Sequence, residues 1–507
     1  MSFDANVLKG VRRGIEKESL RIEPDGTLAR TLHPKALGSA LTHPHITTDF
    51  SESQLELITG VHASVESCLE ELTQIHQVVY RHIGDEGLWC ASMPCNLPAD
   101  NLIPIGRYGF SNVGRAKTVY RLGLAHRYGR RMQAISGIHY NFSVPRLSNE
   151  QYFGLIRNFR RRSWLLLYLF GASPAVCSSF VAGRKHELSE LESPTGASSG
   201  THYAPHATSL RMGRLGYQSE AQSSLCVSYN SLEDYTDSLY EALTRSYPPY
   251  EEIGIKERTG AGDDYKQLST TLLQIENEFY STVRPKRRIR RGERPLHALR
   301  ERGVEYVEVR LMDLDPFSPI GITPATCRML DVFLLHCLAA PSPSDTPQEI
   351  REWQANQQTV ALRGRQPGLA LLRNSREIPL REWGEEILDD CQPIAGELDE
   401  KLGTAAAHRE ALAEARRRLA DPESTPSARV LHAMARNHQN QFLRFALIES
   451  TLHKATLKAL ELPREVRERF ARLADESLLE QREIEQSDAV DFETFRQRYL
   501  AHDSLRV

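Results

Sequence analysis

The stretch Gly14-Ile-Glu-Lys-Glu-Ser-Leu-Arg-Ile22 decides the fold. Side chains on a β-strand point alternately to its two faces. A strand here therefore gathers four side chains on one face, namely Glu16, Glu18, Leu20 and Ile22. A solvated face is the ordinary interpretation of such charges. Because Leu20 and Ile22 do not belong in bulk water, the mixture favours a concave, partly dry surface that holds charged groups.

Three further segments repeat this mixture of charged and apolar residues on one strand face: Gln54–Thr59, Gln133–Val144 and Val304–Met312. The first carries Glu56, the second His139, and the third Glu308 with Arg310. The opposite face of the second and third segments is apolar, so we expect helices to cover it. Together the four segments predict a sheet with one acidic, partly buried face.

Helical patterns lie between and after these segments. Apolar residues recur at helical spacing in Cys68–Tyr80, and Gln151–Leu169 and Ala325–Leu338 also read as buried helices. From about Glu377 onward Ala, Arg, Glu and Leu dominate, which is typical of helices. The sequence therefore predicts an α+β protein with a core over residues 1–376 and a helical C-terminal part, residues 377–507, packed on it.

The overall composition is that of a soluble globular protein. Of 507 residues, 40% are hydrophobic and 25% charged, and the net charge is −3. This balance does not call for nucleic acid or a membrane surface as a partner. The beginning of the chain shows no signal-peptide pattern, so we expect a cytoplasmic protein. Its eight cysteines form no Cys-x-x-Cys pair, which predicts single reduced thiols in the core.

Five carboxylates and one histidine lie on or beside the predicted strands: Glu16, Glu18, Asp49, Glu56, Glu308 and His139. Carboxylates held close together repel one another, and a hard divalent cation with oxygen ligands compensates the repulsion. Each residue alone is more typical of a surface position, so the hypothesis of a Mg²⁺ site depends on the set.

Basic residues complete the predicted chemistry. The run Arg284–Arg291 is densely cationic, and Arg310 shares a strand face with Glu308. A metal-binding carboxylate beside a guanidinium suits the terminal phosphates of a nucleotide. The segment Gly109–Thr118 fails as a P-loop, since Arg115 stands where the lysine is required. Nucleotide binding would therefore depend on the metal rather than on a phosphate loop.

The chain resembles the proteobacterial type of glutamate–cysteine ligase. The matching segments run in order from about residue 10 to residue 321, and only their combination is specific. They include Arg13-Gly-Ile-Glu-Lys-Glu-Ser-Leu-Arg21, Ile46-Thr-Thr-Asp-Phe-Ser-Glu-Ser-Gln-Leu-Glu-Leu-Ile-Thr59, Ile135-Ser-Gly-Ile-His-Tyr-Asn-Phe142, Ala207-Thr-Ser-Leu-Arg211, Leu273-Gln-Ile-Glu-Asn-Glu-Phe-Tyr280, Arg284-Pro-Lys-Arg287 and Glu305-Tyr-Val-Glu-Val-Arg310. The C-terminal third matches only loosely.

The resemblance implies a glutamine-synthetase-like core in which a curved antiparallel sheet forms a funnel. It implies ATP as co-substrate, Mg²⁺ with Mn²⁺ as an alternative, and metal ligands at Glu16, Glu18, Asp49, Glu56, His139 and Glu308. It places Arg310 and Glu308 in catalysis, and we assign the nucleotide phosphates to Arg310, Arg284, Lys286 and Arg287. It implies substrate binding by Arg211, for the glutamate α-carboxylate, and a cysteine pocket of Phe50, Tyr120, Leu124, Gln133, Tyr217 and Tyr280.

The expected reaction joins the γ-carboxylate of glutamate to the amino group of cysteine through a γ-glutamyl phosphate, the first step of glutathione biosynthesis. Loops at Gly183–Tyr203 and Thr259–Tyr265 are candidates for closing the site. A monomer and feedback inhibition by glutathione are further expectations. Two alternatives stay open: a related ligase with another amine as acceptor, and a non-catalytic anion-binding protein that uses the basic run.

Overall fold

One antiparallel sheet organises the chain. The computed structural model describes residues 3–216, 220–223, 225–259, 262–290, 292–501 and 505. The sheet has the strand order β11-β12-β5-β1-β3-β2, with β4 paired to the end of β1, and within the described residues it does not close into a barrel. Its strands are β1 (Arg12–Ile22), β2 (Ile46–Thr48), β3 (Gln54–Ile58), β4 (Gly87–Leu88), β5 (Ile138–Ser143), β11 (Val283–Lys286) and β12 (Tyr306–Met312). The predicted α+β class is confirmed.

Helices cover one face of this sheet. Ile15, Leu55 and Tyr140 point into the largest hydrophobic cluster, where the helices α2 (Val65–His82), α5 (Asn149–Arg162), α6 (Trp164–Phe170) and α12 (Pro324–Ala339) meet them. The helix α2 begins where the Ser64 hydroxyl accepts a hydrogen bond from the Ser67 N–H. Its apolar stripe, predicted from Cys68–Tyr80, is buried. This covered face fixes which side chains of each strand remain on the other face.

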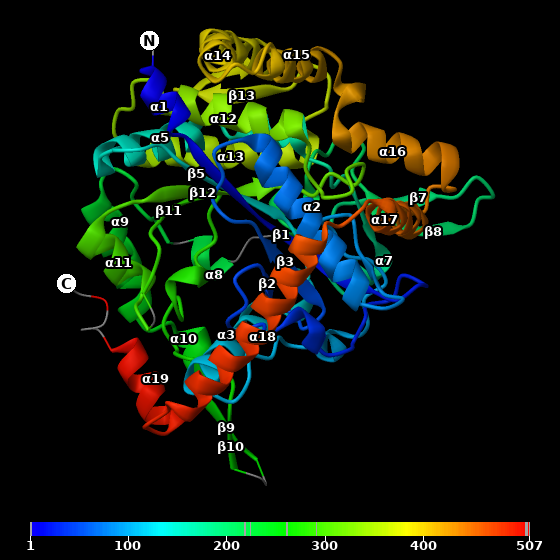
Figure 1. The fold of residues 1–507 in the computed structure, drawn as a ribbon. Coiled ribbons are helices and arrows are strands. Elements are labelled where there is room, and N and C mark those ends of the chain that lie inside the picture. Colours follow the sequence, from blue (N-terminus) through cyan, green and yellow to red (C-terminus); the bar gives the residue numbers. More distant parts are fainter. Residues whose placement is uncertain are drawn as a thin grey trace.

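A second layer of helices follows outside the first. The helices α14 (Leu380–Leu402) and α15 (Ala407–Ala420) pack on α12, and Figure 1 shows them together at one end of the molecule. Further C-terminal helices are α16 (Pro426–Asn437), α17 (Phe442–Ala459), α18 (Arg464–Gln486) and α19 (Phe492–Leu500). The predicted helical character of this part is confirmed. Its division from the core at residue 376 stays a prediction, and the strand β14 (Arg376–Pro379) of the hairpin with β13 (Ala370–Arg373) crosses that position.

A second hydrophobic cluster lies at the far end of β1. Leu20 and Ile22 pack there with Trp89 and with Phe442 and Phe445 of α17. Helix packing therefore accounts for these two apolar residues, which the sequence had suggested belong to the concave acidic surface. The strand β1 carries its charged residues first and then continues beneath the C-terminal helices.

Two elements of the structure have bounds that differ from those predicted from the sequence. The strand predicted over Gln133–Val144 begins only at Ile138, because Gln133 ends the short helix α4 (Arg130–Gln133). The single helix predicted over Gln151–Leu169 is divided at Ser163 into α5 and α6. Apolar residues that precede a strand can continue its alternating pattern by chance. The alternating pattern therefore did not reveal that β5 begins at Ile138.

The cysteine prediction is wrong for one pair. Cys95 and Cys177 are joined by a disulfide, with their Cα atoms 5.2 Å apart and a separation of 82 positions along the chain. The short strand β6 (Ala175–Cys177) brings Cys177 to the loop after Trp89, which contains Cys95. The spacing of the cysteines in the sequence does not indicate this contact. The remaining six are free, and Cys226 is exposed rather than buried in the core.

Two hairpins coincide with the predicted closing loops. The strands β7 (Ser189–Glu192) and β8 (Ser198–Tyr203) project from the body in Figure 1. The strands β9 (Lys256–Thr259) and β10 (Gly262–Tyr265) form the other hairpin, whose residues 260 and 261 lie outside the described part. Their role in closure stays a prediction. In the part of the chain that the structure describes, no helix is both long and apolar enough to cross a membrane.

Candidate functional site

The strand register brings the predicted acidic residues to one face of the sheet. Across the pair of β1 and β5, Glu16 lies opposite His139. Across the pair of β1 and β3, Glu18 lies opposite Glu56. On β12, Glu308 lies opposite Asn141 of β5, two residues after His139 on that strand. Four adjacent strands, β12, β5, β1 and β3, therefore contribute charged side chains to a single surface.

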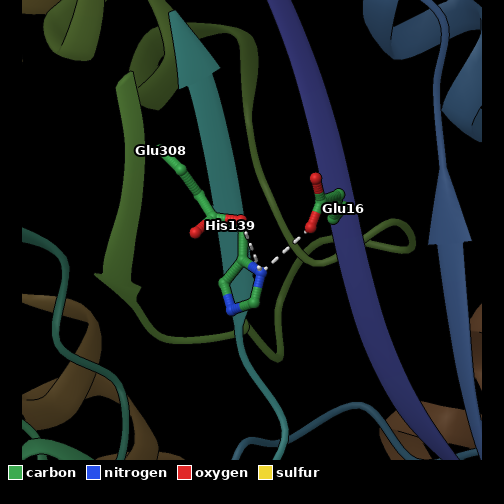
Figure 2. Close-up of side chains that lie close together, drawn as sticks. All are labelled: Glu16, His139 and Glu308. Atoms are coloured by element: carbon green, nitrogen blue, oxygen red, sulfur yellow. Dashed lines mark hydrogen bonds and ion pairs between the residues drawn. The ribbon is translucent and has the colours of Figure 1, made fainter. Parts of the chain in front are cut away.

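His139 stands at the centre of this surface. Its Nδ1 lies 3.2 Å from Glu16 Oε2 and 3.9 Å from Glu308 Oε1, and its Nε2 lies 3.5 Å from Glu18 Oε1. Figure 2 shows Glu16, His139 and Glu308 turned toward one another from β1, β5 and β12. One possible ligand atom from each of these three residues falls within 4.8 Å of the others. The spacing suits a single small cation between them.

The buried carboxylates differ in their electrostatics. Burial, together with the neighbouring Asp49, raises the pKa of Glu18 to about 8, and burial and the other carboxylates raise the pKa of Glu56 well above its usual range. Burial also acts to raise the pKa of Glu308, but nearby cations led by Lys286 and Arg310 outweigh it and hold that pKa well below the ordinary value. Without a cation the carboxyl groups on the β1–β3 side are therefore difficult to ionise together, whereas Glu308 ionises readily.

Three residues that the sequence reasoning did not assign also belong to this surface. Asn141 donates from Nδ2 to Glu16 Oε1 at 2.8 Å, and its Oδ1 is buried without a hydrogen-bond partner. Arg121, from α3 (Asn112–Tyr128), donates from Nε to the carbonyl of Asp49. Lys117 lies one turn before it, and burial beside Arg121 lowers the pKa of Lys117 to about 8. Asn141 alone had a usable signal, since it shares the face of His139.

The predicted phosphate-binding cations divide into two groups. Lys286 Nζ lies 3.3 Å from Glu308 Oε1, and Arg310 Nη1 lies 3.1 Å from Glu308 Oε2, so both reach the acidic surface. Arg284 is buried and donates to the carbonyls of Asn277 and Phe279. Arg287 donates to the carbonyl of Arg302 at 2.7 Å. The structure thus brings Lys286 and Arg310 to the carboxylates and directs the other two toward the backbone.

Arg211 lies beneath the surface next to Glu18. It sits in the short 3₁₀ turn Leu210–Met212 and is only 1% exposed. Its Nη2 donates to the carbonyl of Arg310 at 2.9 Å, and its Nη1 lies 3.8 Å from Asp313 Oδ1. Asp313 is itself held by the Ser173 and Ser209 hydroxyls. Asp313 is a further partner that the sequence did not indicate.

The residues predicted to form the substrate pocket lie around α3. Phe50, Tyr120 and Leu124 share a small hydrophobic cluster with Leu268 and with Phe492 of α19. Gln133 and Tyr280 are joined to each other by the hydrogen bond from Gln133 Nε2 to the Tyr280 hydroxyl, 2.7 Å long, and Tyr280 packs against the second hydrophobic cluster. Tyr217 lies outside the described residues. The C-terminal helix, from which no site residue was predicted, therefore packs against the pocket from outside.

A second acidic group differs from this surface. Glu293, His297 and Glu301 on and before α11 (Pro295–Arg302) also come close together. Both carboxylates are already paired with Arg302. Its Nη1 lies 2.7 Å from Glu293 Oε1 and also contacts the Glu301 carboxylate. Since an arginine already compensates these carboxylates, this group lacks the unfavourable clustering of acidic groups found around Glu18 and Glu56.

Comparisons with known proteins agree over nearly the whole chain. The family model of glutamate–cysteine ligase matches residues 2–360. The glutamate–cysteine ligase of Alcanivorax borkumensis is 46% identical over 518 residues, covering 98% of this chain and 97% of the relative. That of Pseudomonas entomophila is 47% identical over 519 residues, covering 99% and 96%. The crystal structure of glutamate–cysteine ligase from Francisella tularensis in complex with AMP has a TM-score of 0.90 at 36% identity, covering 97% and 98% of the two chains.

An α+β fold with a buried acidic surface, matched at this coverage by such proteins, defines a ligase that joins a carboxylate to an amine. The chain belongs to the glutamate–cysteine ligase family. It forms γ-glutamylcysteine from glutamate and cysteine, the first step of glutathione synthesis. The resemblance stated from the sequence motifs is confirmed, and a purely anion-binding role is excluded as the main function.

Proposed function

We propose that the chain drives this ligation with ATP, through a γ-glutamyl phosphate, at the acidic surface of the sheet. The observation that carries the proposal is the convergence of Glu16, His139 and Glu308 within 4.8 Å. AMP bound to the Francisella tularensis relative supports a nucleotide as the co-substrate. The proposed site is the mouth of a glutamine-synthetase-like funnel whose wall is the open antiparallel sheet.

The donor set fits Mg²⁺, with Mn²⁺ as the alternative. Carboxylate oxygens are the ligands that hard cations prefer, and a histidine nitrogen among them suits Mn²⁺ as well. The raised pKa values of Glu18 and Glu56 mean that their charged forms are disfavoured in this burial, and a bound cation would favour those charged forms. The residues proposed to hold the cation are Glu16, Glu18, Asp49, Glu56, His139 and Glu308. When bound, the cation would supply positive charge that stabilises the negative charge of the transferring phosphoryl group.

Arg310 and Lys286 are proposed to bind the transferring phosphoryl group. Both lie within 3.3 Å of Glu308, so a phosphate at this edge meets two cations and one proposed metal ligand. Positive groups placed where negative charge spreads over the phosphoryl oxygens lower the barrier to transfer. Arg284 and Arg287 are proposed to support the same edge of the site by fixing the backbone around it.

Arg211 is proposed to hold the α-carboxylate of glutamate. It is buried beside Glu18, and its contacts with the Arg310 carbonyl and Asp313 fix its orientation. Phe50, Tyr120, Leu124, Gln133 and Tyr280, with Tyr217, are proposed to form the cysteine pocket. The apolar members would surround the side chain of cysteine, while Gln133 and Tyr280 offer polar contacts.

The proposed sequence of steps follows from the chemistry of a carboxylate. At neutral pH an amine does not displace oxide, because oxide is a poor leaving group. Transfer of the γ-phosphoryl group of ATP to the γ-carboxylate gives an acyl phosphate and ADP. The amine of cysteine then attacks the acyl carbon, the C–O bond to phosphate breaks, and inorganic phosphate leaves as the ammonium proton is lost. Water must be kept out during this interval, since it would hydrolyse the acyl phosphate.

The wider setting is also part of the proposal. We place the enzyme in the cytoplasm as a monomer, with residues 1–376 as the catalytic core and residues 377–507 as a supporting part. Glutathione is proposed to inhibit it by feedback. Gel filtration combined with light scattering, and initial rates in the presence of glutathione, test these two properties independently of the site.

Phosphate release with a panel of acceptors tests the proposed chemistry. The protein is incubated with ATP, Mg²⁺ and glutamate, and cysteine is compared with other small amines at equal concentration. We expect stoichiometric ADP, phosphate and γ-linked dipeptide, with cysteine the best acceptor. Efficient turnover with another amine and none with cysteine would refute the acceptor pocket. Turnover that is unaffected by chelation of divalent cations would refute the metal site.

A further inference from the structure

Glu278 carries a buried charge that the proposed reaction does not use. It lies in the short 3₁₀ turn Glu276–Glu278, shortly before β11. Its side chain and that of Arg127, from the end of α3, are both fully buried, and Arg127 Nη1 lies 2.8 Å from Glu278 Oε1. The pair is far from solvent and touches no proposed metal ligand in the described structure. Its position in the fold, between α3 and the segment before β11, is therefore the property to explain.

The carboxylate of Glu278 accepts three hydrogen bonds from two segments of the chain. Oε1 accepts from Arg127 and from the Tyr128 hydroxyl, the latter at 2.7 Å. Oε2 accepts from the Gln274 N–H at 2.8 Å. Charge-assisted hydrogen bonds of this kind are stronger and more directional than neutral ones. Glu278 thus fastens the end of α3 to the segment that runs from Gln274 to Tyr280.

This junction continues into the proposed cysteine pocket. Gln222, in the short helix α8 (Glu220–Ser223), donates to the Glu278 carbonyl at 2.8 Å and accepts from the Tyr280 N–H at 2.9 Å. The ring of Tyr128 meets that of Tyr280 edge to face, with centroids 5.6 Å apart. The Tyr280 hydroxyl in turn accepts from Gln133. Two paths from Glu278, one through Gln222 and one through the Tyr128 ring, reach Tyr280 and through it Gln133, while Arg127 continues to Gln267 and Gln274 to the Tyr120 carbonyl.

A buried ion pair is a poor choice for stability alone. Removing two charges from water costs about as much as their attraction returns, and an apolar pair of similar volume often stabilises a fold better. What such a pair supplies is a fixed geometry, because its hydrogen bonds are short and directional. The geometry fixed here is the position of Tyr280 relative to α3.

We propose that Glu278, paired with Arg127, is a positioning residue that sets Tyr280 and Gln133 for the acceptor amino acid. The inference rests on the proposed function, which assigns Tyr280 and Gln133 to the cysteine pocket. An acceptor bound loosely or at the wrong angle reacts more slowly with the acyl phosphate, and water then competes with it. Disturbing Glu278 should therefore weaken cysteine binding and release phosphate without dipeptide.

Two variants test this role. Glu278→Gln keeps the shape of the side chain but removes the charge, and Tyr128→Phe removes one hydroxyl while keeping the ring against Tyr280. We expect each to raise the KM for cysteine, by about tenfold for Glu278→Gln, with the KM for glutamate and ATP changed by less than about twofold. The ratio of phosphate to dipeptide should rise above that of the unaltered enzyme. Tyr128→Phe preserves the test where Glu278→Gln fails to fold.

Glu276→Gln is the matched control. Glu276 lies in the same turn and also forms a buried ion pair, 2.6 Å from Arg294, but it faces α11 and not the pocket. We expect it to lower thermal stability and to leave the cysteine KM and the phosphate-to-dipeptide ratio unchanged. If Glu278→Gln and Tyr128→Phe behave like this control, the positioning role is refuted.

A pocket variant separates this inference from the proposed function. Tyr280→Phe removes the hydroxyl that Gln133 contacts. If Tyr280→Phe raises the cysteine KM while Glu278→Gln and Tyr128→Phe do not, the pocket stands and the positioning role falls. If Tyr280→Phe leaves the cysteine KM unchanged, the assignment of the pocket itself is wrong, and the positioning role falls with it.

Discussion

Gly137 is a position where one added carbon should disturb the proposed glutamate-binding residue Arg211. A Cβ built there lies 2.0 Å from Arg211 Nη2 and 2.5 Å from Arg211 Cζ, well inside van der Waals contact. Arg211 cannot move aside freely, because it is buried and its Nη2 is held by the Arg310 carbonyl. Gly137→Ala should therefore displace the guanidinium that we propose holds the glutamate α-carboxylate.

The size of the effect follows from the contact that is lost. A hydrogen bond to a charged group contributes about 1.5–3 kcal/mol. Each 1.4 kcal/mol corresponds to a factor of ten, so the KM for glutamate should rise by about 10- to 150-fold. The KM for ATP should change little. Arg211 bonds the backbone carbonyl of Arg310, whereas the proposed phosphate-binding groups are the side chains of Arg310 and Lys286, which contact Glu308.

Steady-state kinetics with each substrate varied in turn measures the change. Gly154→Ala is the matched control, because a Cβ there meets its nearest neighbour, Ser342 Cβ, at an ordinary 3.6 Å. Gly154 lies inside α5, where alanine is the better helix former, so this variant should fold well and keep both KM values. A folded Gly137→Ala variant with an unchanged glutamate KM would refute the role of Arg211.

Three further predictions address the metal site, stability and the C-terminal helix. Glu308→Gln should reduce kcat/KM by about a hundredfold or more with an unaltered circular dichroism spectrum, and normal turnover would contradict its role. His336 is buried, and burial with the field of Arg162 lowers its pKa to about 4. The unfolded chain binds this proton first, so the free energy of unfolding should fall as pH drops from about 6.5 to about 4, by up to about 1.4 kcal/mol per pH unit. Urea titrations at pH 7 and pH 5 measure the free energy of unfolding of the protein and of His336→Gln. If this free energy falls by the same amount in both between the two pH values, the role of His336 is disproved. Phe492→Ala should lower the free energy of unfolding by about 3–5 kcal/mol, because it leaves a cavity in the cluster of Phe50, Tyr120 and Leu124. It should also raise the cysteine KM, and an unchanged KM would show that α19 does not support the pocket.

Local alternation predicted the strands of the sheet well where the strand is long and both faces are distinct. β1, β3 and β12 lie within a few residues of the predicted segments. The same reasoning failed at Gln133, where a helix turn precedes β5 and its side chain reaches Tyr280 instead of the sheet. Residues next to a strand carry no local mark of where the strand begins.

Long-range contacts explain what the sequence could not predict about the site. The face shared by Glu16, Glu18 and His139 followed from period two, since each strand supplies its own pattern. The contact of Arg121 with Asp49, and of Asp313 with Arg211, depends on how α3 and the loop after β12 fold over the sheet. The disulfide of Cys95 was missed for the same reason.

The strand β1 belongs to two hydrophobic clusters at once, with Ile15 in the first and Leu20 in the second. The second cluster also contains Phe445 of α17, far along the chain. Opening α17 would therefore expose one half of the strand whose other half supports the acidic surface. We expect the amide hydrogens of β1 and α17 to exchange with solvent together, in one cooperative unit, so that damage to the C-terminal helices disables the enzyme long before the rest of the chain unfolds.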